Sequence, residues 1–205
     1  IKIPILKTKK NKTMTSQTIT RIKQLSFILM ITSVLSFPAF GQNNQSKKVT
    51  ASQTVPSVDI HTAVMKDNIA AVKQHIAAKS DINEKEKFGG STPLISASLF
   101  GKTEIAKLLI DAGAKLNIQN NEGSTALITA AFFCKPEIVK MLLAKKADKT
   151  IKNKYGNTAL ETVSAPFQDA KPIYDIMGSS LAPLGVKFDY EYLKKTRPQI
   201  AAMLK

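Results

Sequence analysis

The side chains best suited to chemistry in this chain are two histidines and one cysteine. His61 and His75 are the only histidines, and Cys134 is the only cysteine. A structural metal site needs several Cys or His ligands at short, regular spacings, and none of the three has such a neighbour. No glycine-rich phosphate loop is present either, because Gly89-Gly90 is typical of a turn. We therefore expect no metal, no cofactor, and structural roles for both histidines.

Cys134 leaves three alternatives open. A thiol nucleophile needs an adjacent base, and His61 is far away in the sequence, so we predict no catalytic residue and no enzyme. An exposed Cys134 would form an intermolecular disulfide, since one thiol cannot make an internal bridge. A partly buried Cys134 would be inert.

The positive net charge would suit binding of nucleic acid, but the distribution of the basic residues does not support that function. The chain has 30 Lys and Arg against 15 Asp and Glu. Residues 1–41 hold seven of the basic residues and no acidic one, which leaves 23 against 15, or about +8. The remaining lysines are scattered along the sequence, as is typical of a solvated surface. We predict no nucleic-acid partner.

The N-terminal part has the pattern of an export signal. After Met14, a basic stretch precedes the 13-residue apolar run Leu25–Phe37, which is shorter than the roughly 18 residues of a spanning helix. Small residues then precede Gln42. We expect a signal peptide at 14–41 and a polar, flexible linker at 42–57, and we exclude 1–13 as upstream non-native translation. An uncleaved anchor is the alternative; after cleavage we expect no stable membrane insertion.

A five-residue segment recurs every 33 residues along the rest of the chain. It is GSTPL at Gly90–Leu94, GSTAL at Gly123–Leu127 and GNTAL at Gly156–Leu160, and a looser copy at Asp59–Val64 precedes them at an offset of 34. Apolar residues after each copy also align, at helical spacing. They are Ile105, Leu108 and Leu109, then Ile138, Met141 and Leu142.

This pattern resembles the ankyrin repeat, G-x-T-P-L-H-x-A-A followed by I-V-x-L-L and G-A-D-V-N. The resemblance implies an all-α solenoid of paired antiparallel helices with β-hairpin loops over residues 58–178, and a C-terminal helical cap over 179–205. Thr92, Thr125 and Thr158 would begin helices, where a hydroxyl accepts from free backbone N–H groups.

The sequence departs from the family pattern at several positions. Ile95, Ile128 and Glu161 replace the usual histidine, which His61 keeps, and Cys134 and Phe167 replace a loop glycine. Lys79 and Lys146 replace the glycine that ends the second helix, which Gly113 keeps.

The C-terminal part is expected to close the stack. We predict a degenerate second helix at Pro166–Met177, interrupted by Pro172, and two short helices at Asp189–Thr196 and Pro198–Leu204. These helices would cover the open end, because an uncapped stack exposes its core. The alternative is that this appendage carries the specific function.

The resemblance implies a non-catalytic protein–protein interaction module, here a monomer acting in the periplasm or outside the cell. The alternative is an inhibitor, immunity-type or protective factor for a co-exported toxin or enzyme. In such repeats the partner meets the concave face and the hairpin tips. By alignment, this face would contain Met65, Phe88, Leu99, Phe100, Phe132, Phe133 and Tyr155. Packing between neighbouring repeats or under the linker at 42–57 is the competing interpretation for Leu99, Phe100, Phe132 and Phe133.

Overall fold

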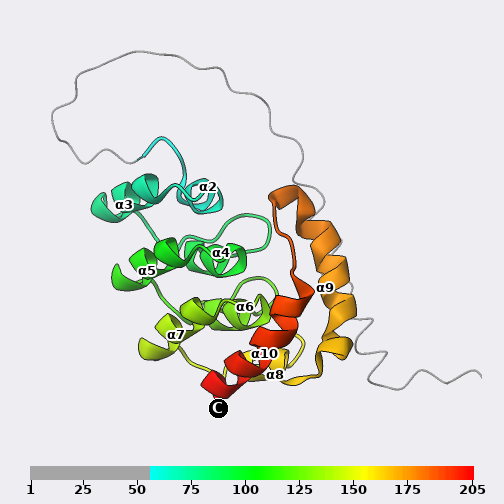
Figure 1. Cartoon of the computed structure of the whole chain (residues 1–205). Helices are drawn as coiled ribbons and strands as arrows, with labels where there is room; N and C mark the ends of the chain where they lie inside the picture. Colours follow the sequence, from blue (N-terminus) through cyan, green and yellow to red (C-terminus); the bar gives the residue numbers. More distant parts are fainter. Residues whose placement is uncertain (1–55) are drawn as a thin grey trace, which may run out of the picture.

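The computed structural model describes residues 56–205, and all regular structure in this part of the chain is helical (Figure 1). The predicted signal peptide, and all but the last two residues of the predicted linker, lie outside the described residues. Three helix pairs stack on one another. They are α2 (Ile60–Met65) with α3 (Ile69–Ala77), α4 (Pro93–Phe100) with α5 (Thr103–Asp111), and α6 (Ala126–Phe132) with α7 (Pro136–Ala144).

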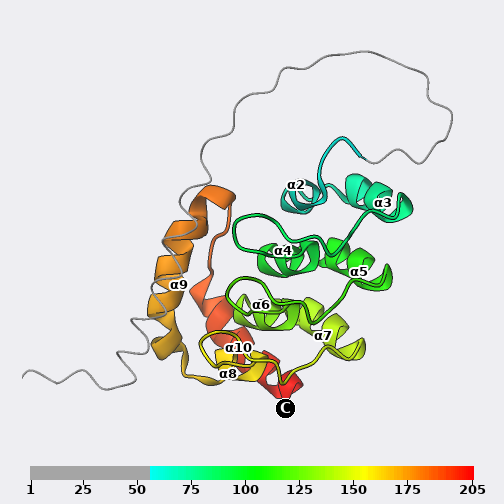
Figure 2. The same cartoon turned by 180° about the vertical axis from the view of Figure 1, so that it is seen from behind.

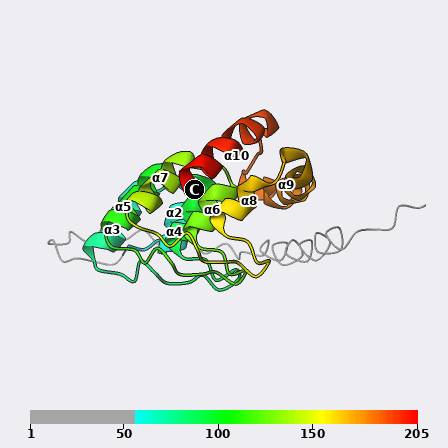
Figure 3. The same cartoon turned by 90° about the horizontal axis from the view of Figure 1, so that it is seen from below.

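The first helices of the pairs form an inner row and the second helices an outer row. α2, α4, α6 and α8 (Ala159–Ser164) pack in succession, and α3, α5 and α7 pack behind them. The connecting loops project together from one side of the stack (Figure 3). They are tight turns, and the described residues contain no assigned strand, so the β-hairpin loops form without strand pairing. The predicted repeat architecture is confirmed.

The helix starts are fixed as the sequence predicts. The hydroxyls of Thr92, Thr125 and Thr158 accept from backbone N–H groups three residues further on. Asp59 does the same for the looser first copy, through the backbone N–H of Thr62. Each cap satisfies a donor that has no partner within its helix.

The core of the stack consists of the aligned apolar positions. Ile105 and Leu109 of α5, and Ile138 and Leu142 of α7, are fully buried. A single repeat cannot bury these side chains alone, so stability comes from contact between neighbours. No helix within residues 56–205 is both long and apolar enough to cross a membrane.

The substitutions at glycine positions keep the glycine conformation. Cys134 has a φ of 52°, beside 68° for the equivalent Gly101. Lys79 and Lys146 are also left-handed, with φ values of 55° and 61°. A non-glycine residue adopts this region at a cost, so packing of the helices on either side must hold these turns.

The fourth repeat departs from the prediction at Ala165-Pro166. Instead of the left-handed turn of the other repeats, both residues are extended, with ψ values of 149° and 143°. Proline disfavours a helical conformation in the residue before it, which explains the change. The next helix, α9 (Phe167–Leu181), therefore leaves the stack rather than forming its second helix.

α10 (Tyr190–Leu204) takes the place in the stack that was predicted for residues 166–177. It packs on α8 and α7, whereas α9 runs along the inner row from the level of α8 towards α4 (Figures 1 and 2). The short 3₁₀ helix η2 (Ala182–Leu184) follows α9. The outer position at the end of the stack is thus filled by the last helix of the chain.

The predictions for the two prolines were wrong. Pro172 lies inside α9 and does not interrupt it, and Pro198 lies inside α10 and does not begin a separate helix. Each proline removes one helical hydrogen bond. In α10 this loss is offset by Leu193, Ile200 and Leu204, which are buried against the end of the stack.

Candidate protein-binding groove

The aromatic residues at the end of α6 hold α9 against the inner row. Phe133 is 5% exposed and packs with Met177 and Leu181 of α9. Phe132 stacks on Tyr174 with ring centroids 4.8 Å apart, and the Tyr174 hydroxyl donates to the Phe132 carbonyl at 2.6 Å. α9 is therefore anchored at α6.

A groove of about 460 Å³ lies between the inner row, the hairpin tips and α9. Its apolar residues come from the helices, and its polar residues come largely from the tips. They include, from the inner row, Ile95, Leu99, Ile128 and Phe132; from α9, Ala170, Ile173 and Met177; and from the tips, Ser91, Asn120, Glu122, Ser124, Asn153, Tyr155 and Asn157. An apolar cavity with a few placed polar groups is typical of a binding site.

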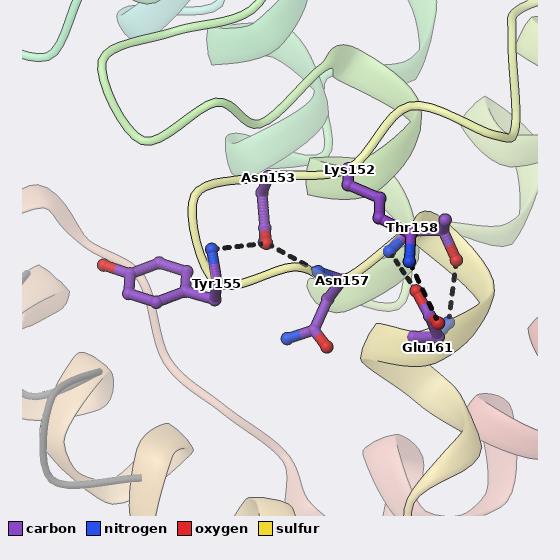
Figure 4. A network of polar contacts seen from close by, with 6 residues as sticks. All are labelled: Lys152, Asn153, Tyr155, Asn157, Thr158 and Glu161. Atoms are coloured by element: carbon purple, nitrogen blue, oxygen red, sulfur yellow. Dashed lines mark hydrogen bonds and ion pairs between the residues drawn. The ribbon is translucent and has the colours of Figure 1, made fainter. Parts of the chain in front are cut away.

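The two tips that line the groove are shaped by asparagines at equivalent positions. Asn153 Oδ1 accepts from the backbone N–H groups of Tyr155 and Asn157, both at 3.0 Å (Figure 4). Asn120 Oδ1 accepts in the same way from Glu122 and Ser124. These side-chain bonds mimic a backbone turn, so they hold the residues of each tip in a defined orientation.

A second polar group lies beside the Asn153 tip. The Thr158 backbone N–H donates to Glu161 at 2.6 Å, and the Thr158 hydroxyl accepts from the Glu161 backbone at 3.3 Å (Figure 4). The N–H donated by Thr158 lowers the pKa of the Glu161 carboxyl. Glu161 therefore stays ionised at neutral pH. It occupies the position at which the ankyrin-repeat pattern has a histidine.

The tips of successive repeats are also joined to each other. The Tyr155 hydroxyl donates to Glu122 Oε2 at 2.8 Å, and the backbone N–H of Lys154 donates to the Glu122 carbonyl at 2.9 Å. Burial, followed by the Glu122 carboxylate, raises the pKa of Tyr155. Tyr155 therefore remains a hydrogen-bond donor over the physiological pH range.

A family model described as ankyrin repeats, in three copies, matches residues 60–153. Residues 60–153 of the chain form an ankyrin-repeat stack. The solved ankyrin-repeat domain of Bcl-3, a unique member of the IkappaB protein family, is 27% identical with a TM-score of 0.50, over 58% of this chain and 50% of that one. Dauer abnormal formation protein 25 of Caenorhabditis elegans is 35% identical over 75 residues, 36% of this chain.

The similarity to these proteins covers parts of them. The matched region spans about half of the Bcl-3 chain and 19% of the Caenorhabditis elegans protein. The family match ends before α8, so α9 and α10 lie outside it. The wall of the groove formed by α9 is thus outside the part that the ankyrin model describes.

The residues predicted for the concave face of the ankyrin stack fall into two groups. Leu99, Phe132, Phe133 and Tyr155 all line the groove. Phe133 is covered by α9, a contact that the prediction of packing between repeats or under the linker did not include, whereas Leu99 and Phe132 are partly buried. Their binding role remains a prediction.

The other predicted residues do not line the groove. Met65 and Phe88 are 44% and 64% exposed near the N-terminal end of the stack, and Phe100 is partly exposed. Asn120 and Asn153 were not predicted, although their recurrence at the period of the repeat is a usable signal. Ile173 and Met177 were not predicted either, because nothing local shows that α9 turns towards the inner row.

Beneath the groove, Arg197 of α10 binds the end of α8. Its Nη1 donates to the Thr162 carbonyl at 3.1 Å and to the Tyr174 hydroxyl at 3.0 Å, and its Nη2 donates to the Ala165 carbonyl at 3.0 Å. These carbonyls are the free acceptors of the helix C-terminus, where a cation is favoured. Arg197 therefore joins α8, α9 and α10.

The histidines have no access to Cys134. His75 Nε2 lies 2.8 Å from the Val58 carbonyl and its Nδ1 lies 3.1 Å from the Ser80 hydroxyl, which is a structural arrangement. His61 lies in α2, two layers from Cys134, with α4 between them. Both of its ring nitrogens are buried without a hydrogen-bond partner among the described residues.

Cys134 is expected to be inert to thiol reagents in the folded protein. The residue is fully buried, and burial raises the pKa of its thiol to about 11. Only about one thiol in a thousand is then ionised at pH 8, and the thiolate is the reactive form. Reaction with a chromogenic disulfide reagent should be slow between pH 7 and 9 and become rapid in denaturant. Rapid labelling of the native protein would show that Cys134 is accessible.

Proposed function

We propose that this ankyrin-repeat protein is a non-catalytic interaction module that binds a segment of a partner protein in the groove between the inner row and α9. The observation that supports this most is the groove itself, which combines apolar helix residues with tips fixed by Asn120 and Asn153. Interfaces combine an apolar centre and a polar rim in the same way. Ankyrin repeats typically mediate protein–protein interaction and are usually non-catalytic, which agrees with this role.

Site-specific photo-crosslinking tests the proposed function. A benzophenone amino acid at Asn157, which lines the groove, should link the protein to its partner in cells, and the partner can be identified by mass spectrometry. The matched control is the same group at Lys140, an exposed residue of the outer helix α7. Equal products from both positions, or products from Lys140 alone, would place the interface outside the groove.

We also propose that the chain acts after export, in the periplasm or outside the cell. The support is the basic stretch, short apolar run and small residues within 14–41. Mass spectrometry of the protein from its native cells should find a mature N-terminus at Gln42. A soluble cytosolic protein that retains residues 14–41 would contradict this proposal.

A further inference from the structure

We propose that the groove is selective for an extended segment of the partner in which basic and large apolar side chains alternate. The proposal rests on the proposed function, because it specifies the chemistry of the segment bound at the same site. Three features of the groove lead to it: the sign of its charge, a carboxylate oxygen at its edge, and its lining by residues from two sides.

The groove differs in charge from the protein around it. Three carboxylates line it, from Glu122, Glu161 and Asp169, and Arg197 is the one basic residue among the described residues that do so. The described part as a whole is basic, since residues 56–205 contain 21 Lys and Arg against 15 Asp and Glu. An acidic segment would be attracted to the outer surface but would meet like charge in the groove.

Arg197 does not offset these carboxylates for an incoming ligand. Its side chain is 2% exposed, and its two terminal nitrogens donate to carbonyls of α8 and to Tyr174. Its remaining nitrogen, Nε, is buried and has no described partner. The guanidinium is committed to the joint between α8 and α10. Lys152 Nζ lies 4.0 Å from Glu161 Oε1 and partly offsets that carboxylate, so we assign the position for a partner's cation to Glu122.

Glu122 offers a defined position for a cation. Its Oε2 accepts from the Tyr155 hydroxyl, which fixes the orientation of the carboxylate. Its Oε1 accepts no hydrogen bond from any described residue, and Glu122 is one of the residues that line the groove. A Lys or Arg of the partner would find there an acceptor that is already oriented and costs little to order.

The two-sided lining of the groove favours an extended segment over a helix. In an extended chain, successive side chains point to opposite sides. Apolar residues can then meet Ile95, Leu99 and Ile173 while a basic residue on the other side meets Glu122. Asn157, whose carboxamide makes no hydrogen bond with the described residues, is available to the backbone of the segment (Figure 4).

Three fluorescent twelve-residue peptides test the proposal with the full chain. The first peptide alternates lysine and leucine, and the second alternates glutamate and leucine. The third has the same composition as the first, with its leucines spaced three and four residues apart, as in an amphipathic helix. Fluorescence anisotropy should show that the first binds at least tenfold more tightly than the second and more tightly than the third. Raising the salt concentration should weaken its binding, because the charges are partly exposed.

Variants of the protein test whether the peptide binds at Glu122 and Ile173. Glu122→Gln keeps an acceptor for Tyr155 but removes the charge, and should weaken the alternating lysine peptide about fivefold, in the range of a partly exposed ion pair. Glu137→Gln, on the outer helix α7, should leave binding unchanged. Ile173→Ser should weaken binding by removing apolar surface from α9. The thermal unfolding of each variant verifies that it is folded.

The outcomes separate this proposal from the function on which it rests. Equal binding of the lysine and glutamate peptides, or no effect of Glu122→Gln, overturns the charge selectivity. Tighter binding of the helical arrangement overturns the extended form. If Ile173→Ser still weakens binding in these cases, the groove remains a protein-binding site. If Ile173→Ser has no effect and Asn157 yields no crosslink, the proposed function fails as well.

Discussion

Replacing Arg197 with methionine is expected to lower the free energy of unfolding by about 3–5 kcal/mol. The guanidinium is 2% exposed and donates to the Thr162 and Ala165 carbonyls and to the Tyr174 hydroxyl. Methionine fills much of the same volume but donates nothing, so these buried acceptors lose their partner. The loss also separates α10 from the end of α8, where it closes the stack. Urea unfolding followed by circular dichroism measures the change.

Two further substitutions make the Arg197 result specific. Lys195→Met removes a positive charge from an exposed position on the same helix and should change stability by less than about 0.5 kcal/mol. Arg197→Lys keeps the charge but loses the planar fork that reaches several acceptors, so it should lie between methionine and the wild type. A loss below about 1 kcal/mol for Arg197→Met would mean that the carbonyls find other donors, water included.

Replacing Phe133 with alanine is expected to lower the free energy of unfolding by about 3–5 kcal/mol. Phe133 is 5% exposed, packs with Met177 and Leu181, and stacks on Phe188 with centroids 5.9 Å apart. The substitution leaves a cavity under α9 and should make α9 easier to detach. Thermal unfolding gives the stability, and hydrogen exchange of the backbone amides of α9 should rise more than that of α5.

Phe100→Ala is the matched control, because Phe100 is also an aromatic residue at the end of an inner helix. Phe100 is partly exposed and belongs to neither buried cluster, so its replacement should cost less than about 1 kcal/mol. Equal stability of Phe133→Ala and the wild type would contradict the packing of α9. Partner capture by both variants then shows whether either aromatic residue also contributes to binding.

Much of the groove could be predicted from the repeat. The spacing of 33 residues placed Thr92, Thr125 and Thr158 at helix starts, and the alignment placed Leu99 and Tyr155 in one region of the surface. These predictions succeed because a repeat contacts only its neighbours, so a residue's surroundings follow from its position in the period. Met65 and Phe88 hold aligned positions but lie in the first repeat and its loop, beyond the part of the stack that borders the groove.

The C-terminal helices could not be predicted in the same way, because their positions depend on contacts with distant residues. Ala165-Pro166 indicates a break in the repeat, yet a break does not specify the direction of the next helix. That direction is set by Phe132 and Phe133, which pack with Tyr174, Met177 and Leu181 of α9. Pro198 resembles a helix start in isolation, and burial of Ile200 and Leu204 keeps the helix continuous through it.

The sequence by itself determined the ankyrin architecture, the helix caps and four of the residues that line the groove, Leu99, Phe132, Phe133 and Tyr155. These features are local or repeat at a fixed period, and their physical causes act over a few residues or between adjacent repeats. The tertiary structure alone decided that α10, not residues 166–177, completes the stack and that α9 lies along the inner row. It also decided that Phe133 and Cys134 are covered. In each case the reason is burial of apolar surface between segments far apart in the chain, which no local pattern encodes.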